Sequence, residues 1–446
     1  MLQKIKFSFS QIIILLLFIS LILRFYNLNY SDYWGDEHNT FFVSDPSLSF
    51  SQTLERIFAI ENTHLFYFLL KKVFDFFGYY SEYGRITTAI VGSLIPAIIF
   101  FIFYKKIPSN ILILACLTIS SNIYLIDHSQ EVRVQTYTCV TFLLAIWGSI
   151  RFLETKHYLY AIFFIFFSIL SSMQHIFGLL IFISFGIYSL FLSYKNFLKI
   201  NIVNIIGITI FLILNFKFLQ KLFEIDQIAF AEPNINFYYD FYFTYFFGSF
   251  IFGKIVLATY LLLLAFNLKQ ILIKKNHILF ITIIIFSSYL FPLIYTYVRQ
   301  PCMAPRSIIF VLPLIIYSLF YFYSISHFKL KKIIMLILVA MSFVITFYSI
   351  INLKTQNLTR IKNYLDLNKI SNIDLYIISS NVRKINYYSN NKYFEKNNIR
   401  LKIRNNLEHI PKRNLIIVDS KGIISSEELI KYNIVYEDPW NLIIKH

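Results

Sequence analysis

The sequence predicts an all-α polytopic membrane protein that carries a small C-terminal α/β domain. Of the 446 residues, 57% are hydrophobic and only 15% are charged, whereas charged residues normally make up about a quarter of a soluble domain. The apolar residues fall into runs long enough to cross about 30 Å of hydrocarbon. After residue 351 these runs stop, and Asn, Lys and Glu become frequent. This composition excludes a soluble fold and intrinsic disorder.

Eleven apolar runs are expected to cross the membrane. The first follows Lys4 and Lys6 but has no small-residue cleavage site, because Arg24 and two aromatic residues come next. We therefore expect an uncleaved span rather than a signal peptide. The expected spans are residues 9–23, 85–104, 109–126, 132–150, 158–173, 176–194, 200–216, 249–268, 277–297, 307–326 and 333–351.

The charge distribution supports this count and sets the orientation. With a cytoplasmic N-terminus, the inner loops hold 14 of the 25 basic residues before position 352, and of the 15 acidic residues only Glu154. Basic residues mark the cytoplasmic side. Segment 63–77 could be a twelfth span, but that would move the basic loops outside. We expect it to be an interfacial helix on the outer surface, with Lys71 and Lys72 at the headgroups. The net charge of +17 then reflects topology and contact with membrane lipids, not nucleic acid.

Two segments lie outside the pattern of spans and short loops. The first outer loop, 26–84, is rich in aromatic residues and carboxylates, and belongs to an expected transmembrane domain of residues 1–351. The tail, 352–446, is expected to form an extracytoplasmic α/β domain, since an odd number of spans places it outside. Its helix-like and strand-like runs are residues 358–367, 375–378, 415–418 and 434–436, with a capped helix start at 425–429.

Polar residues gather at the outer ends of the expected spans, in four clusters on one face of the membrane. Ionisable residues at the membrane edge are expensive and favour a functional interpretation, although each cluster alone could be a solvated loop. The clusters are Asp32 to His38 after the first span, Asp127 to Arg133 before the fourth, Gln174-His175 before the sixth, and Arg299 to Arg306 before the tenth.

Several motifs occur in a fixed order along roughly the first 320 residues. They are Arg24-Phe-Tyr-Asn-Leu with Trp34-Gly-Asp-Glu, Asn62-Thr-His-Leu-Phe-Tyr-Phe-Leu-Leu, Phe77-Gly to Arg85-Ile, His128-Ser-Gln-Glu-Val-Arg, His175-Ile-Phe-Gly, and Pro305-Arg leading to Pro313. The ordered set resembles the GT-C membrane glycosyltransferases, which include protein O-mannosyltransferases and aminoarabinose transferases. Both prolines of the family's HPPL stretch are missing, so either Asn62 or His64 takes its His/Lys position.

The resemblance implies a glycosyltransferase of the plasma (inner) membrane. Such enzymes take a sugar from a polyprenyl-phosphate or diphosphate carrier and pass it to a glycan, lipid or protein acceptor at the outer face. The acceptor hydroxyl must lose its proton as it attacks, which suits a carboxylate base. Asp36 is the expected base, Glu37 its orienting neighbour or an acceptor ligand, and Glu131 the second carboxylate of the site.

Other residues are expected to bind substrate, and above all the carrier phosphate, because guanidinium groups bind phosphate bidentately. For three of them a structural role is the alternative: Arg133 could pair with Glu131 or Asp127, Arg85 could anchor the interface, and His175 could be a satisfied structural histidine at the start of an apolar helix. The position of His38 beside Asp36 and Glu37 suggests a site for a divalent metal. Three adjacent residues are weak support for such a site, however, and we predict no metal or other cofactor. The expected binding residues are His64, Arg85, Gln130, Arg133, His175, Arg299 and Arg306.

Two other classes of membrane protein share this composition. A lipid-linked saccharide flippase would place polar residues in mid-span and often shows repeated halves, and neither pattern is clear here. A polysaccharide polymerase or ligase typically has its largest outer loop late in the chain, whereas the carboxylate-rich loop here follows the first span. We therefore favour the glycosyltransferase.

Overall fold

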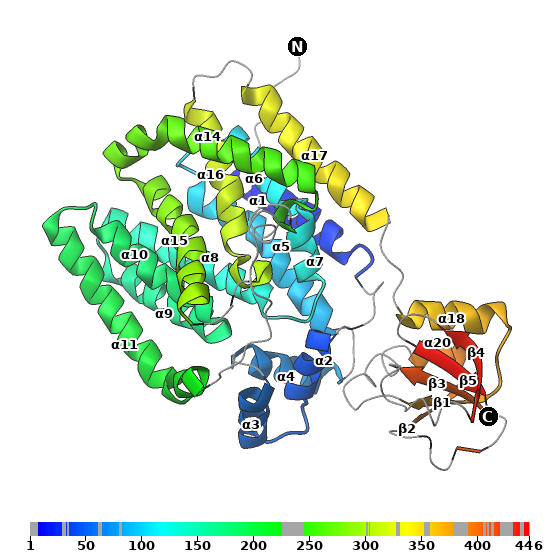
Figure 1. The fold of residues 1–446 in the computed structure, drawn as a ribbon. Helices are drawn as coiled ribbons and strands as arrows, with labels where there is room; N and C mark the ends of the chain where they lie inside the picture. Colours follow the sequence, from blue (N-terminus) through cyan, green and yellow to red (C-terminus); the bar gives the residue numbers. More distant parts are fainter. Residues whose placement is uncertain are drawn as a thin grey trace. The chain divides into compact units, whose positions relative to one another are not determined.

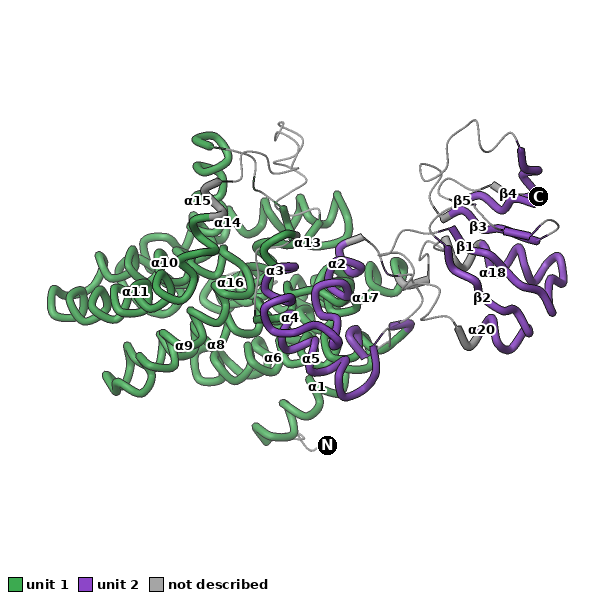
Figure 2. The backbone as a smooth tube through the Cα atoms, turned by 90° about the horizontal axis from the view of Figure 1, so that it is seen from below, with its two compact units in different colours: residues 1–26, 57–66, 86–352 green, residues 27–56, 67–85, 353–446 purple. Residues whose placement is uncertain are grey.

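The computed structural model describes two compact units. One comprises residues 1–26, 57–66 and 86–352, and the other residues 27–56, 67–85 and 353–446 (Figure 2). The described residues are mainly helical, with one small sheet (Figure 1). They are residues 8–28, 33, 35–60, 65–79, 83–224, 245–299, 302, 304–326, 331–351, 357–378, 391–404, 407, 410–411, 414–419, 431–437 and 441–445.

Helices of the first unit coincide with each of the eleven expected apolar runs. They are α1 (Phe9–Phe25), α5 (Tyr83–Phe103), α6 (Ser109–Ser120), α7 (Ile123–Ser129), α8 (Gln135–Thr155), α9 (Tyr158–Gln174), η1 (Ile176–Leu179), α10 (Leu180–Ser189), α11 (Tyr194–Glu224), α14 (Phe250–Lys274), α15 (His277–Val298), η3 (Pro305–Ile308), α16 (Val311–Ile325) and α17 (Lys331–Ile351), with a short α13 (Tyr245–Phe247) before α14.

Fewer than eleven helices meet the length and hydropathy that a membrane crossing requires. Within the described residues, six helices are long and apolar enough to cross a membrane: α5, α8, α11, α14, α15 and α17. The pair α6–α7 makes a seventh if it is one span bent by 54°. Helices α1, α9, η1–α10 and α16 are apolar but shorter. The expected count of eleven therefore stays a prediction.

The bend between α6 and α7 is fixed by Asn122. Its side chain accepts a hydrogen bond from Leu125 N at 3.1 Å, which caps α7, and donates one to Phe246 O at 2.8 Å. Both polar ends of this buried amide are thereby satisfied, as burial requires. The bend aims the end of α7, and the turn that follows it, away from the axis of α6.

Helix α16 lies in the core of the first unit, and α11, α14 and α17 lie at its surface. All residues of α16 up to Tyr323 are buried, and the Ser318 hydroxyl donates to Leu314 O at 2.6 Å within the helix. The surface helices expose large aliphatic side chains, such as Ile213 at 72% and Ile251 at 72%. Lipid-facing helices have this character, since only apolar side chains and an internally satisfied backbone are stable in hydrocarbon.

The described part of the tail forms a five-stranded mixed sheet with two helices. The strand order is β2-β1-β3-β5-β4, with β2, β1 and β3 parallel and β5 and β4 antiparallel to their neighbours. The expected helix 358–367 and the three expected strands are present, whereas the helix start at 425–429 lies outside the described residues. The domain boundary at 352 stays a prediction. The elements are α18 (Asn357–Leu367), β1 (Asp374–Ile378), α20 (Asn391–Lys396), β2 (Arg400–Arg404), β3 (Leu415–Asp419), β4 (Asn433–Glu437) and β5 (Asn441–Lys445).

The first outer loop contains α2 (Gly35–Val43), α3 (Phe50–Ile60) and α4 (Leu65–Phe77). Helix α4 is the amphipathic helix expected over 63–77, with Phe74 buried and Phe76 82% exposed. Lys72 is also exposed. The Nζ of Lys71 donates to Leu48 O and to Thr53 Oγ1, so it ties α4 to the preceding segment. The expected position of both lysines at the headgroups stays a prediction.

Candidate functional site

A buried ion pair in the second unit joins two of the predicted site residues. Glu37 lies in the first turn of α2 and Arg85 in the first turn of α5. Arg85 Nε donates to Glu37 Oε1 at 3.0 Å and Nη2 donates to Oε2 at 2.7 Å. The Glu37 side chain is fully buried and that of Arg85 is 2% exposed, and the guanidinium lies 4.3 Å from the centre of the Tyr33 ring. Arg85 thus pairs with a carboxylate of the protein, and its expected role in binding substrate stays a prediction.

Asp36 begins the same helix and is half-buried. An acidic side chain in the first turn is favoured by the positive end of the helix dipole. Helix α2 is held at its far end, where the Phe41 ring stacks on Phe74 at 4.9 Å and Phe41 O accepts a hydrogen bond from Tyr79 Oη at 2.9 Å. The predicted base therefore stands on an anchored helix beside the buried Glu37.

His38 follows Glu37 and is buried, at 3% exposure. Among the described residues, no three His, Cys, Asp or Glu side chains are grouped so that they could hold a metal ion. The expectation of a metal-free site stays a prediction.

The first unit gathers a second set of predicted residues around Glu131, in the turn between α7 and α8. His128 Nδ1 lies 3.0 Å from Glu131 Oε2. Burial raises the pKa of Glu131, but His128, Arg133 and Arg306 together outweigh it and hold this pKa below its ordinary value. The pKa of His175 is lowered to about 4 by burial and by the same two arginines. Three segments far apart in sequence therefore supply one cluster of two arginines, two histidines and a carboxylate.

The α7–α8 turn is fastened to the end of α1. Gln130 Nε2 donates to Arg24 O and to Tyr26 O, both at 2.9 Å, and Arg24 Nε donates to Ser129 Oγ at 3.2 Å. A Cβ atom on Gly92 would lie 2.1 Å from Ser129 Oγ, so only glycine permits this approach. Gln130 therefore has both amide hydrogens on the backbone of the protein, and its expected role in binding substrate stays a prediction.

His175 and Gly178 of the His-x-x-Gly motif shape the backbone turn that follows α9, in addition to any chemical role of the histidine. His175 ends α9, and its Nδ1 accepts a hydrogen bond from Phe177 N at 3.3 Å, so the histidine also caps η1. A Cβ on Gly178 would lie 2.5 Å from the backbone of Ser171. The His-x-x-Gly spacing therefore produces a tight turn that returns the chain along α9. The turn leaves the imidazole beside Arg133 and Arg306.

Two predicted residues, His64 and Arg299, are not part of the contacts described above. His64 lies outside the described residues. Arg299 ends α15 and is exposed, and its N–H donates to Tyr295 O at 2.9 Å. Tyr124 was not predicted, yet its ring packs edge-on against His128 at 4.5 Å between centroids. Its position four residues before His128 could have indicated this contact, because residues four apart on a helix share one face.

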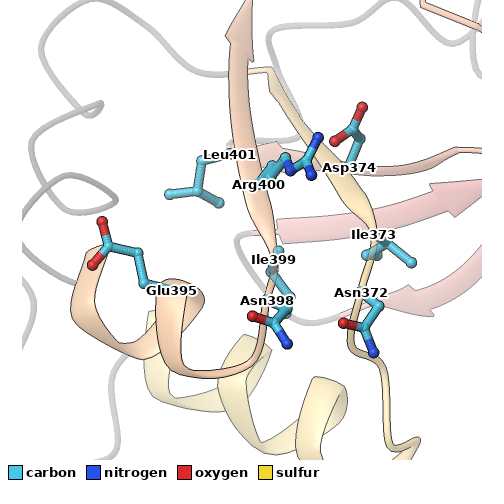
Figure 3. A pocket seen from close by; sticks show the side chains of 8 residues that line it. All are labelled: Asn372, Ile373, Asp374, Glu395, Asn398, Ile399, Arg400 and Leu401. Atoms are coloured by element: carbon cyan, nitrogen blue, oxygen red, sulfur yellow. The ribbon is translucent and has the colours of Figure 1, made fainter.

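The tail contains a separate open pocket of about 820 Å³ beside the starts of β1 and β2. Figure 3 shows the amides of Asn372 and Asn398 at its rim, with Glu395 on the α20 side. Asn372 and Asn398 both have left-handed backbones (φ 55° and 54°), which asparagine tolerates. Asp374, which also lines the pocket, accepts a hydrogen bond from Lys402 Nζ at 2.5 Å. None of the motifs in the sequence pointed to this pocket.

Comparison with known proteins identifies the fold. No family model matches the chain, and no curated protein matches it in sequence. Two crystal structures of ArnT from Cupriavidus metallidurans do match in three dimensions. The apo structure has a TM-score of 0.59 and the structure bound to undecaprenyl phosphate one of 0.58, each at 10% identity and covering 97% of both chains. ArnT is an aminoarabinose transferase of the GT-C family. The resemblance predicted from the ordered motifs is thus confirmed for the fold: this chain shares the fold of these two ArnT structures, and its apolar helices are those of an integral membrane protein.

Proposed function

We propose that the protein is a membrane glycosyltransferase that moves a sugar from a polyprenyl-phosphate carrier to an acceptor at the outer face of the plasma membrane. The observation that carries the proposal is the cluster of Arg133 and Arg306 around Glu131 and His175. The cluster lies in a fold that this chain shares with ArnT, and ArnT has been crystallised with undecaprenyl phosphate. Two guanidinium groups are well suited to the oxygens of a phosphate monoester.

In this proposal the cluster holds the leaving group. Arg133 and Arg306 bind the phosphate oxygens and stabilise the negative charge that grows as the sugar–phosphate bond breaks. His175 stays neutral at pH 7, since its pKa is about 4, and offers a hydrogen bond without a further charge. Glu131 balances the arginines before the carrier binds and stabilises the positive charge that develops on the sugar.

Asp36 acts as the general base. The acceptor hydroxyl oxygen attacks the anomeric carbon, the bond from that carbon to the phosphate oxygen breaks, its electron pair stays on the phosphate, and the hydroxyl proton passes to Asp36. A carboxylate is a sufficient base because the proton becomes acidic as the new bond forms. Glu37 and Arg85 serve as positioning residues, since their buried pair fixes the first turn of α2.

The activity is tested with membranes that contain the protein and a polyprenyl-phosphate sugar labelled in the sugar. Transfer of label from the carrier to a second molecule, with release of polyprenyl phosphate, is the expected result. Movement of intact carrier across the bilayer without transfer would overturn the proposal in favour of a flippase. Growth of a chain on the carrier itself would indicate a polymerase instead.

The base is tested by Asp36→Asn, which keeps the size of the side chain and removes the proton acceptor. We expect turnover to fall by about 10²–10⁴-fold, with donor binding largely retained. Glu37→Gln is the matched variant one residue away, and it should lower stability more than it lowers the turnover of the folded fraction. Near wild-type turnover for Asp36→Asn, with an inactive Glu37→Gln, would reverse the two assignments.

A further inference from the structure

A second basic site lies in the first unit, at the opposite end of α8 from the Glu131 cluster. It is a pocket of about 290 Å³. Helix α8 begins at Gln135, directly after the Glu131 turn, and ends at Thr155 beside the pocket. Its 21 residues span roughly 30 Å at 1.5 Å per residue. The pocket therefore lies about one membrane thickness from the cluster, at the end predicted to be cytoplasmic.

The lining of this pocket is positively charged. Its ionisable side chains are Lys106, Lys156, Lys275, His277, Tyr188 and the single carboxylate of Glu154. That carboxylate is already shared, because Lys106 Nζ donates to Oε1 and Arg151 Nη1 donates to Oε2 at 3.2 Å.

Two exposed lysines therefore remain without a counter-charge among the described residues. Among the residues that the structure describes, neither Lys156 nor Lys275 has a carboxylate within ion-pair distance. Burial and the nearby charge of Lys199 lower the pKa of Lys156, which is the direction expected for a cation in a basic surrounding.

The backbone holds these two lysines in fixed positions. Each is the left-handed C-cap of a helix, Lys156 of α8 (φ 61°) and Lys275 of α14 (φ 46°). Their N–H groups donate to Phe152 O at 2.9 Å and Ile271 O at 3.1 Å, and Lys275 O accepts from Tyr188 Oη at 2.7 Å. A left-handed backbone is unfavourable for lysine, so surrounding contacts must hold it in place.

We infer that this pocket binds a phosphate group, supplied by the headgroup of an anionic lipid or by free phosphate. The cationic surplus matches a phosphate anion, and basic pockets between transmembrane helices at the cytoplasmic side are suited to anionic headgroups. The exposed apolar side chains nearby on α11 and α14, such as Leu198 and Ile273, would accommodate the acyl chains of a lipid. The inference is independent of the proposed transfer reaction, because it concerns the other end of the bundle.

The test uses the purified full-length protein in a neutral detergent and follows its thermal unfolding. Three probes are titrated: a short-chain phosphatidylglycerol, the matching phosphatidylcholine, and inorganic phosphate. The variant is Lys156→Gln/Lys275→Gln. The control is Lys105→Gln/Lys274→Gln, which removes the same charge from two exposed neighbours that do not line the pocket.

We expect phosphatidylglycerol to raise the melting temperature and phosphatidylcholine to leave it unchanged. The apparent affinity should fall roughly 30-fold in the pocket variant and stay near wild type in the control, since each lysine close to an anionic headgroup contributes about fivefold. Each single variant should lose about fivefold in apparent affinity. The single variants therefore test the inference even if the double variant does not fold. The same pattern with inorganic phosphate alone would identify free phosphate as the source. Equal loss in both double variants, or no shift with either anion, would overturn the inference.

Discussion

The buried pair of Glu37 and Arg85 makes a quantitative prediction. Arg85→Gln removes two charge-assisted hydrogen bonds, of 3.0 and 2.7 Å, from a carboxylate that has no solvent exposure. Breaking a buried ion pair from one side costs about 3–5 kcal/mol, because the remaining charge stays buried. We therefore expect Arg85→Gln to lower the free energy of unfolding by about that amount, and the melting temperature by several degrees.

A double-mutant cycle assigns this loss to the pair. In Glu37→Gln/Arg85→Gln both charges are gone, so the double variant should be more stable than the sum of the two single losses implies, by about 1–3 kcal/mol. Arg56→Gln is the control, since Arg56 lies 3.7 Å from Asp45 in a partly exposed pair worth no more than about 1 kcal/mol. The assay is thermal or denaturant unfolding of the purified variants. Additive single losses, or an Arg85→Gln loss no larger than that of Arg56→Gln, would refute the reasoning.

Three further predictions follow from the other described contacts. In a Cys302→Ser background, a cysteine at Ser51 should react with an impermeant thiol reagent from outside and one at Lys274 should not; the reverse pattern would invert the topology. The pKa of His175 is about 4, below its ordinary 6.5, so the folded state favours the neutral ring and loses stability as pH falls from 6.5 toward 4; His175→Gln should lose less stability over that range, as melting temperatures against pH would show. Gln130→Met removes two hydrogen bonds to the backbone and should cost about 1–3 kcal/mol of unfolding free energy, while a rise in donor KM without loss of stability would instead support direct substrate contact.

Local composition predicted the helical framework, because an apolar run in a membrane protein must satisfy its backbone within itself. Each expected run contains a helix, and the tail strands 375–378 and 415–418 are present as buried parallel strands. Strand β2 was not predicted, since its alternation Arg400-Leu-Lys-Ile-Arg is short and half polar. The α6–α7 bend depends on Asn122 and Phe246, two residues whose contact no local pattern reveals.

The candidate site was predictable in part. Topology alone placed Glu131, Arg133, His175 and Arg306 at the same ends of their helices, and these residues gather in the first unit. The partners of Arg85 and Gln130 depend on contacts between distant segments. Arg85 is 48 residues from Glu37, and Gln130 is more than 100 residues from the backbone oxygens it binds. Residue type alone suggests that Arg85 and Gln130 bind phosphate or substrate, whereas their partners within the protein are known only from the fold.

The most direct test of the central claim is equilibrium binding of labelled undecaprenyl phosphate to the purified protein, in nanodiscs that contain an excess of anionic phospholipid to occupy any other phosphate site. Arg133→Gln/Arg306→Gln is compared with wild type and with Lys217→Gln/Lys269→Gln, which removes two exposed charges elsewhere in the same unit. If the cluster holds the carrier phosphate, the arginine variant should bind at least roughly 100-fold more weakly, because two charge-assisted interactions are lost, and the lysine control should bind as the wild type does. Unchanged affinity in the arginine variant, with the protein folded, would contradict the account.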